Sequence, residues 1–161
     1  MILILGASGY IGNNLYNTFI KEDFDVAGTY SKNKISEMVY FDICNMNLDE
    51  LKLNKKIHYI IIASGININI DNSKRDWKNS YYVNVIKTKI IIDYCFENNI
   101  IPIYISSDAV FDGLKGGYKE IDKKNPVNCY GLIKNEVEDH LLNSGNKFII
   151  LRMGRVFGTD L

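Results

Sequence analysis

A tyrosine and a lysine four residues apart, Tyr130 and Lys134, are the pair in this sequence best suited to proton transfer. On a helix, residues at this spacing share one face. A free tyrosine has a pKa near ~10 and is a poor general acid or base at neutral pH, and a neighbouring ammonium group favours its ionised form. The spacing therefore predicts that Tyr130 transfers a proton with help from Lys134. Tyr30 and Lys34 share the spacing, but their segment reads as a loop and offers no helical face.

An apolar run ends in two hydroxyl side chains, Ser106 and Ser107, followed by Asp108. If this run is a strand of a parallel sheet, its carboxyl end lies at the edge where such sheets bind ligands. Ser107 is then placed to hydrogen-bond a substrate carbonyl or alkoxide beside Tyr130, and Asp108 is expected to lie near the same substrate. Serines are also common turn formers at strand ends, and that alternative stays open.

A glycine-rich segment follows the first apolar run of the chain. Its GxxGxxG pattern would allow a tight turn, close approach of a pyrophosphate, and close packing of the next helix on the strand. Backbone N–H groups at the start of that helix would face the anion, with support from the helix dipole. The residues expected to contact a dinucleotide here are Gly6, Ser8, Gly9, Tyr10, Ile11 and Gly12. A glycine-rich turn without a ligand is the alternative.

The ends of the second and third apolar runs indicate which dinucleotide is favoured. An acidic residue after the second run would hold the ribose 2′-hydroxyl of NAD, but the chain reads Tyr30-Ser31-Lys32 there. Ser31 can donate to a 2′-phosphate and Lys32 can neutralise it, so NADP(H) is favoured over NAD(H); Lys32 as an ordinary solvated lysine is the alternative. Asp42 and Ile43 are placed to meet the adenine, unless Asp42 only caps a short helix.

These residues must be positioned by an alternation of apolar runs and helix-compatible stretches, which is typical of βαβ units around a parallel sheet. Several runs lack polar alternation, as expected of strands with helices on both faces. The six expected strands are Ile2 to Leu5, Asp25 to Thr29, Met38 to Phe41, His58 to Ala63, Pro102 to Ser106 and Lys147 to Leu151. The expected helices are Tyr10 to Lys21, Asp76 to Glu97 and Cys129 to Asn143, and the long connection is Asp112 to Pro126. The rhythm predicts one α/β domain, a doubly wound parallel sheet of the Rossmann type.

Composition narrows the classes of function. The 161 residues, 47% of them hydrophobic, suit one domain with a substantial core. Nineteen Lys and Arg balance 19 Asp and Glu, so no basic field favours nucleic acid or an anionic membrane. Three separated cysteines indicate reduced thiols in a cytoplasmic protein rather than a disulfide framework or a metal site. No targeting or anchoring segment is visible, and we expect no metal.

The residues above resemble the extended short-chain dehydrogenase/reductase superfamily and, within it, the dTDP-4-dehydrorhamnose reductase (RmlD-like) branch. The superfamily likeness rests on the glycine loop, Asp42, Asn84, Ser107 and the Tyr130–Lys134 pair. The branch likeness rests on SSDAVFDG at 106–113, which is similar to the family's STDYVFDG, and on the spacing of Tyr, Glu, Asp, Pro and Asn residues through 118–138. The stretch from Leu151-Arg152 to Gly158 is similar to the family's LRxxxVxG.

The resemblance implies NADPH-dependent reduction of a nucleotide-linked 4-keto-6-deoxy sugar, as in dTDP-rhamnose and polysaccharide biosynthesis. Tyr130 would protonate the developing alkoxide, with Lys134 and Ser107 in support, and Lys134 would also hold the nicotinamide ribose. Where the family usually has a small, alanine-rich segment, this chain departs from it with Ala63, Ser64 and Gly65, which are expected near the cofactor, followed by an unusual run at 66–70. Ala109 and Arg155 replace an aromatic residue and a tryptophan of the family, which leaves the sugar nucleotide open.

Family members carry a further C-terminal portion with most of the sugar-nucleotide contacts, which this sequence does not include. We therefore expect residues 1–161 to be the NAD(P)-binding domain with the catalytic residues, which binds NADP(H) but reduces sugar nucleotides poorly or not at all alone. Two other functions stay open: an epimerase or dehydratase of the same superfamily, and a non-catalytic regulatory subunit. The expected partner is a nucleotide sugar, and a homodimer remains an option.

Overall fold

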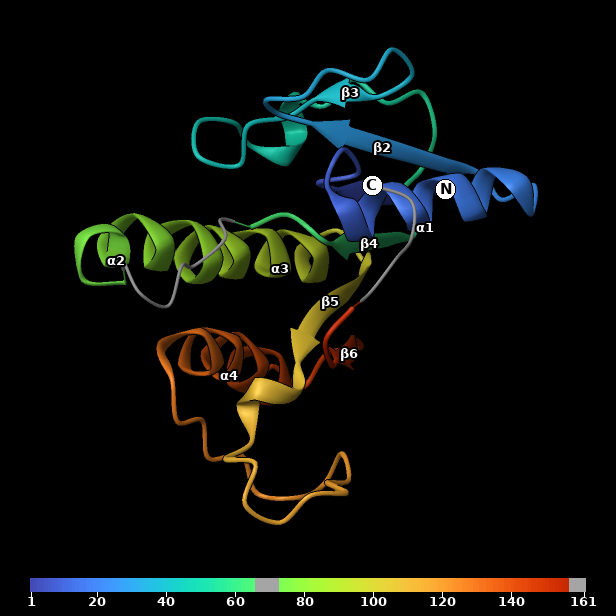
Figure 1. Ribbon diagram of the computed structural model, residues 1–161. Helices are drawn as coiled ribbons and strands as arrows, with labels where there is room; N and C mark the ends of the chain where they lie inside the picture. Colours follow the sequence, from blue (N-terminus) through green and yellow to red (C-terminus); the bar gives the residue numbers. More distant parts are fainter. Residues whose placement is uncertain (66–72, 157–161) are drawn as a thin grey trace.

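The computed structural model describes residues 1–65 and 73–156, and in these ranges six strands form one parallel sheet. The strand order is β3-β2-β1-β4-β5-β6, so the chain builds outward from β1 in one direction and then crosses back to build in the other (Figure 1). The strands are β1 (Ile2–Leu5), β2 (Val26–Tyr30), β3 (Val39–Tyr40), β4 (Tyr59–Ile62), β5 (Ile101–Ser107) and β6 (Ile149–Met153). The predicted doubly wound parallel sheet is confirmed.

The helices lie between the strands in chain order. They are α1 (Tyr10–Lys21), α2 (Ser73–Tyr81), the π-helical segment η3 (Tyr82–Lys87), α3 (Thr88–Glu97) and α4 (Cys129–Leu142), with short 3₁₀ turns η1 (Leu48–Glu50) and η4 (Asp108–Val110). In the described ranges, none of these helices is long and apolar enough to cross a membrane.

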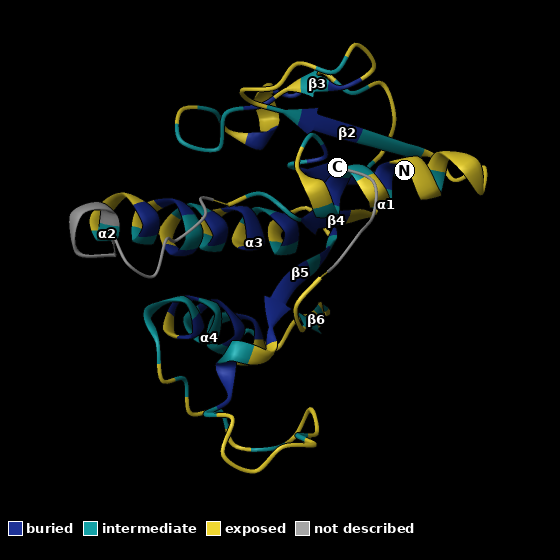
Figure 2. Cartoon of the chain, viewed as in Figure 1, coloured by how far each residue is buried: buried dark blue, intermediate teal, exposed yellow. Residues whose placement is uncertain are grey.

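The core lies on both faces of the sheet because successive strand residues point to opposite sides. On one face Leu3, Ile60 and Tyr104 belong to a cluster that continues into buried residues of α3 and α4. On the other face Ile4 and Ile61 pack with residues of α1. Figure 1 shows α1 on one side of the sheet and α3 and α4 on the other, and the central strands are buried in Figure 2. Helices therefore cover both faces, as the unbroken apolar runs predicted.

The stretch predicted as one helix from Asp76 to Glu97 differs from a uniform helix. It begins earlier, at Ser73, and η3 interrupts its α-helical course. A π-helical turn widens the hydrogen-bonding pattern, and the hydroxyl of Thr88 donates to the carbonyl of Val83, five residues before it, at 3.2 Å. Such segments are frequent at functional sites, and Asn84 lies within this one.

Candidate active site

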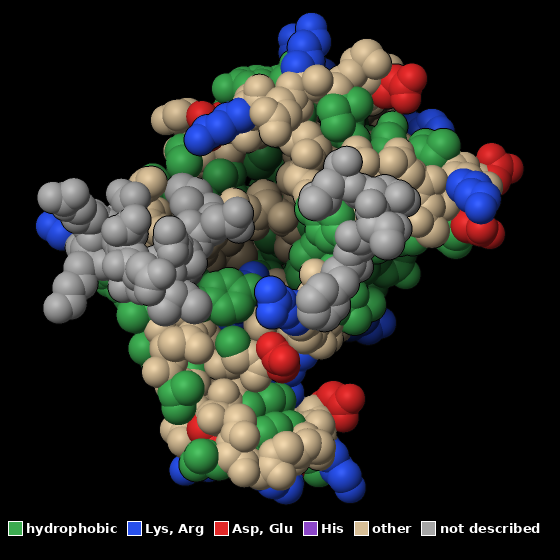
Figure 3. Space-filling model, viewed as in Figure 1, with side chains coloured by type: hydrophobic (Ala, Val, Ile, Leu, Met, Phe, Trp, Pro, Cys, Tyr) green, Lys and Arg blue, Asp and Glu red, His purple; other side chains and the backbone are tan. Residues whose placement is uncertain are grey.

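Two adjoining cavities lie at the carboxyl ends of the central strands, where the switch point between β1 and β4 places ligands. One has a volume of about 470 Å³ and the other about 500 Å³. They share Ser64 and Gly65, which follow β4. The space-filling view shows a hollow near the middle of this face (Figure 3). The two cavities therefore adjoin at Ser64 and Gly65, and together they are called the groove.

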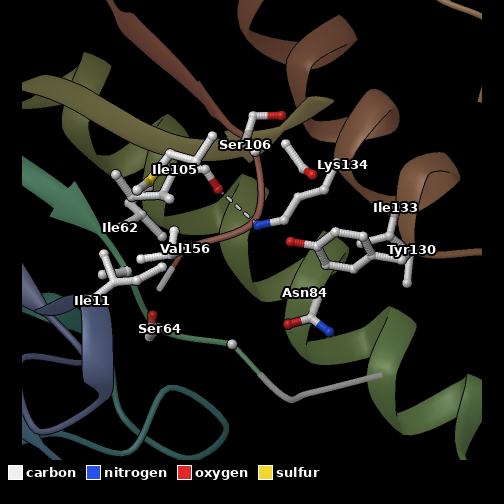
Figure 4. A pocket seen from close by; sticks show the side chains of 15 residues that line it. Ile11, Ile62, Ser64, Asn84, Ile105, Ser106, Tyr130, Ile133, Lys134 and Val156 are labelled. Carbon is white, nitrogen blue, oxygen red and sulfur yellow. Dashed lines mark hydrogen bonds between the residues drawn. The ribbon is translucent and has the colours of Figure 1, made fainter. Parts of the chain in front are cut away.

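The first cavity, here called the catalytic cavity, brings together the Tyr130, Lys134 and Ser107 side chains predicted to act on substrate. Tyr130 and Lys134 extend from α4 into the same space, with Asn84 of η3 close by (Figure 4). The Lys134 Nζ lies 5.7 Å from the centroid of the Tyr130 ring and donates a hydrogen bond of 2.7 Å to the carbonyl of Ile105. The ammonium group is thus held between α4 and β5.

The start of α4 is fixed by a cap and a close backbone crossing. The side chain of Asn128 accepts a hydrogen bond of 2.8 Å from the Gly131 N–H and so satisfies a free amide of the first turn. Gly131 packs against η4, where a Cβ on this residue would lie 2.1 Å from the carbonyl oxygen of Ala109. The absence of a side chain at Gly131 therefore lets α4 approach closely enough for Tyr130 to reach the cavity.

Burial changes the acid–base properties of the pair. It lowers the pKa of Lys134 to about 8, and the charge of Glu138 acts in the opposite direction. Burial raises the pKa of Tyr130 above its ordinary value; the hydrogen bond with Ser107 lowers it, and the charge of Asp108 raises it further. Without cofactor, Tyr130 therefore keeps its proton at neutral pH, which is the form a proton donor needs.

Ser107 both forms a turn and lines the catalytic cavity. Its hydroxyl donates to Asp108 Oδ1 at 3.0 Å and accepts from the Ala109 N–H at 3.2 Å, so it caps η4. The turn-forming role and the position beside Tyr130 are thus compatible. Asp108 itself is exposed and lines a separate neighbouring cavity that also includes Arg152. The structure therefore brings Ser107, but not Asp108, to the lining of the catalytic cavity.

The second cavity, here called the nucleotide cavity, lies beside the glycine loop. Gly12 is buried, and a Cβ there would lie 2.3 Å from the carbonyl oxygen of Gly6, so the loop and α1 need glycine at this crossing. The Gly6 N–H donates to the Thr29 hydroxyl at 3.0 Å. Gly9 caps α1 without a side-chain hydrogen bond, and the first turn has no acidic residue. This helix start is suited to an anion.

Predicted cofactor residues are divided between the cavities. Those that line the nucleotide cavity are Gly6, Tyr30, Ser31, Lys32, Asp42 and Ile43. Those that line the catalytic cavity are Ile11, Ala63, Tyr130 and Lys134, while Ser64 and Gly65 line both. The glycine-loop residues that line neither cavity are Ser8, Gly9, Tyr10 and Gly12. The structure thus gathers most of the predicted set along one groove.

Asp42 has the local contacts of a turn cap. One carboxylate oxygen accepts from the Cys44 N–H at 2.9 Å, and the other accepts from the Asn45 side chain at 2.8 Å. Hydrogen bonds from Cys44 and Asn45 lower the pKa of this carboxyl group. The capping alternative therefore holds, and the carboxylate still lines the nucleotide cavity.

A bound dinucleotide would give a partner to one buried atom of this groove. The Ser64 hydroxyl oxygen is buried and, within the described part of the chain, has no hydrogen-bond partner. It lies where the two cavities meet. Buried polar groups are nearly always hydrogen-bonded, so a ligand in the groove would supply the partner that Ser64 lacks within the described residues.

Several groove residues were not assigned a role from the sequence. Thr29 and Asn79 line the nucleotide cavity, and Asn84 lines the catalytic cavity. In the sequence analysis Asn84 was named only as part of the family likeness. Its polar side chain among the apolar residues of a long helix was the signal that could have indicated a role in the site. Asn79 follows no pattern in the sequence, because it reaches the cavity only through the packing of α2.

The chain matches the RmlD substrate-binding domain family over residues 1–160. The chain belongs to this family. In sequence it is 31% identical over 98% of its length to a dTDP-4-dehydrorhamnose reductase of Aggregatibacter actinomycetemcomitans, of which it covers 52%. It is 30% identical, over 98% of its length, to methionine adenosyltransferase 2 subunit beta of Danio rerio, of which it covers 48%. The chain thus spans about half the length of these curated relatives.

Solved structures of the same family share the fold. A hypothetical dTDP-4-dehydrorhamnose reductase from Sulfolobus tokodaii superposes with a TM-score of 0.83 at 30% identity, over 97% of this chain and 56% of that one. A dTDP-4-dehydrorhamnose reductase from Bacillus anthracis, solved in complex with NADP, superposes with a TM-score of 0.76 at 25% identity, over 95% of this chain and 52% of that one. The resemblance predicted from the motifs is confirmed.

Proposed function

We propose that this chain is the cofactor-binding and catalytic half of an NADPH-dependent reductase of a nucleotide-linked 4-keto-6-deoxy sugar. One observation carries the proposal: Tyr130, Lys134 and Ser107 line one cavity, and that cavity adjoins a second one beside the glycine loop. The dTDP-4-dehydrorhamnose reductases among the relatives support the choice of substrate class.

The groove and the adjacent start of α1 would together offer a contact for each part of the cofactor. The start of α1 would bind the pyrophosphate, and Asp42 and Ile43 would contact the adenine. Ser31 and Lys32 would bind the 2′-phosphate, and both are exposed at the rim of the nucleotide cavity. The ammonium of Lys134 would hold the nicotinamide ribose. Bound NADPH supplies the hydride for carbonyl reduction.

The residues of this chain would supply the proton. The phenol of Tyr130 donates its proton to the sugar's C4 oxygen as that oxygen gains negative charge, which leaves a hydroxyl on the product and a phenolate on the enzyme. Lys134 stabilises the phenolate, and the Ser107 hydroxyl hydrogen-bonds the reacting oxygen. Water then returns a proton to Tyr130. The raised pKa of Tyr130 suits this direction, because the donor begins protonated.

The test is single-turnover reduction of dTDP-4-dehydrorhamnose with NADPH, followed by nicotinamide absorbance, with the chain in large excess so that the poor reduction expected of residues 1–161 alone is still measured. Tyr130→Phe should keep NADPH affinity and slow reduction by about 10²-fold or more, the usual size of a general-acid contribution. Tyr59→Phe, at the opposite end of the sheet at the start of β4, is the matched control and should behave as wild type. Equal reduction rates in the wild type and Tyr130→Phe would contradict the proposed role.

Cofactor preference has its own test. Ser31→Asp places a carboxylate where a 2′-phosphate would bind, and should weaken NADPH binding by about tenfold or more while leaving NADH binding unchanged or tighter. Ser36→Asp adds the same charge at an exposed position farther along the loop, outside the lining of the nucleotide cavity. Equal effects of the two variants on NADPH affinity would remove the argument from Ser31.

A non-catalytic subunit is the second candidate, favoured by the likeness to methionine adenosyltransferase 2 subunit beta. Such a chain would bind NADP(H) in the same groove and act by contact with a partner enzyme. It predicts that wild-type chain binds NADPH yet reduces no 4-keto sugar nucleotide even in a single turnover. Tyr130→Phe would then leave the chain's effect on its partner unchanged.

A further inference from the structure

A fully buried carboxylate lies one helical turn beyond Lys134. The side chain of Glu138 is 0% exposed and is the acceptor for three close hydrogen bonds. Its Oε1 accepts from the Ser106 hydroxyl at 2.6 Å and from Arg152 Nε at 2.9 Å, and its Oε2 accepts from Arg152 Nη2 at 2.8 Å. Lys124 Nζ lies 3.3 Å from Oε2. Burial alone would raise the pKa of Glu138, but these contacts bring it below the ordinary value.

These contacts join separate parts of the fold at the edge of the catalytic cavity. Glu138 belongs to α4, Ser106 to the end of β5, and Arg152 to β6. Arg152 also donates to the carbonyl of Glu120 at 2.9 Å and lies over the ring of Phe111, 5.0 Å from its centroid, so the long connection is held as well. One carboxylate therefore aligns the helix that carries Tyr130 with the strand end that carries Ser107.

The same carboxylate and the ammonium group of Lys134 bind adjacent residues at the end of β5, Ser106 and Ile105. Residues four apart share a helix face, so Glu138 follows Lys134 on the side directed at the sheet. The other groups around the ammonium are the ring of Tyr104, 4.8 Å from Nζ, the ring of Tyr130 and the carbonyl of Ile105. Within the described residues, Glu138 is the carboxylate whose charge acts on Lys134.

Stability is a weak reason for this arrangement. Removing two charges from water costs several kcal/mol per ion, and apolar side chains of similar volume often replace a buried ion pair without loss. A buried carboxylate beside a catalytic cavity is therefore better explained by what it orients and by the charge that it supplies. Its hydrogen bond with Ser106, the residue before Ser107, and its place one helical turn after Lys134 support that explanation.

We propose that Glu138 is a positioning residue that fixes α4 against the ends of β5 and β6 and places a buried negative charge one helical turn from Lys134. The consequence for proton transfer rests on the proposed function, because a charged Lys134 is what stabilises the Tyr130 phenolate. The effect on the charge of Lys134 is a property of the free chain. It can therefore be tested without cofactor or substrate.

The experiment is a pH titration of the Lys134 side chain by lysine-selective NMR in the ligand-free chain. Wild type should titrate with a pKa of about 8. Glu138→Gln, which keeps the shape and removes the charge, should lower that pKa by about one unit, because it removes a negative charge that Arg152 partly neutralises. Glu136→Gln is the matched control, because Glu136 lies on the same helix but pairs with Lys89. It should leave Lys134 unchanged.

A second variant acts in the opposite direction and does not remove the buried carboxylate. Lys124→Met removes one of the cations that neutralise Glu138, so the pKa of Lys134 should rise. This keeps the proposal testable even where Glu138→Gln does not fold. An unchanged Lys134 titration in Lys124→Met, or equal shifts in Glu138→Gln and Glu136→Gln, would overturn it. Full reductase activity of Tyr130→Phe would instead overturn the proposed function, and it would not affect the conclusion drawn from the Lys134 titration.

Discussion

Replacing Gly131 with alanine would measure how closely α4 must approach η4. A Cβ at this position would lie 2.1 Å from the carbonyl oxygen of Ala109 and 2.9 Å from the Cβ of Pro126. Ordinary carbon–oxygen contacts begin near ~3.3 Å, and the nearest obstacle is backbone rather than a flexible side chain. The helix start would therefore have to move by roughly 1 Å.

The magnitude follows from two opposing effects. Overpacking of a tight contact costs typically ~1–3 kcal/mol, and more where backbone must shift. Alanine recovers up to ~1 kcal/mol of helix propensity relative to glycine. Because the overlap at Gly131 is severe, we expect a net loss of about 2 kcal/mol in the free energy of unfolding. A displacement of about 1 Å at Tyr130 should also slow reduction by about 10²-fold.

Urea unfolding followed by circular dichroism measures the stability change directly. Gly154→Ala is the matched control, because the nearest atom to its Cβ would be an Asp108 carboxylate oxygen at 3.4 Å, an ordinary contact. It should keep the wild-type free energy of unfolding within about 0.5 kcal/mol. Wild-type or greater stability of Gly131→Ala would refute the claim that this crossing sets the position of α4.

Three further predictions concern other parts of the fold. The hydrogen bond from Tyr118 and further hydrogen bonds lower the pKa of Asp112 to about 2. Their contribution to stability is therefore present above the unfolded pKa near ~3.9 and is lost as pH falls toward 2. In urea unfolding, the stability advantage of the wild type over Asp112→Asn should shrink in that range, and a constant difference would contradict this. Burial raises the pKa of Cys95 to about 12, so an aromatic disulfide reagent should modify it only on unfolding, and rapid native labelling would contradict its buried position. Arg152→Met leaves the buried Glu138 carboxylate with fewer partners and should lower the free energy of unfolding by ~3–5 kcal/mol in urea unfolding. Wild-type stability of Arg152→Met would contradict this.

The sequence predicted the parts of the fold that local patterns determine. The first strand and the first helix have the bounds expected, because an unbroken apolar run meets a glycine loop and then a helix with periodic apolar residues. The ends of the other strands are shifted by one or two residues, and residues such as Ile101 and Ser107 join the sheet through pairing with a neighbouring strand. Pairing is a tertiary effect, so a single strand does not specify its own ends.

The remaining features depend on contacts between distant residues. The Ser106–Glu138 hydrogen bond joins residues 32 apart in sequence, and no local pattern indicates it. The π-helical segment at Asn84 is likewise invisible in a stretch whose composition suits an ordinary helix. The raised pKa of Tyr130 follows from burial, which sequence spacing does not specify. Spacing predicted the pairing of Tyr130 with Lys134, and tertiary packing set the properties of the two side chains.

The most direct test of the account is a fluorescence titration of the chain with NADPH and with NADH, following energy transfer from Trp77 and the tyrosines to the reduced nicotinamide. The account predicts saturable binding, with NADPH bound about tenfold or more tightly, a difference of about 1.4 kcal/mol. Absence of saturable binding of either nucleotide, or tighter binding of NADH, would contradict it.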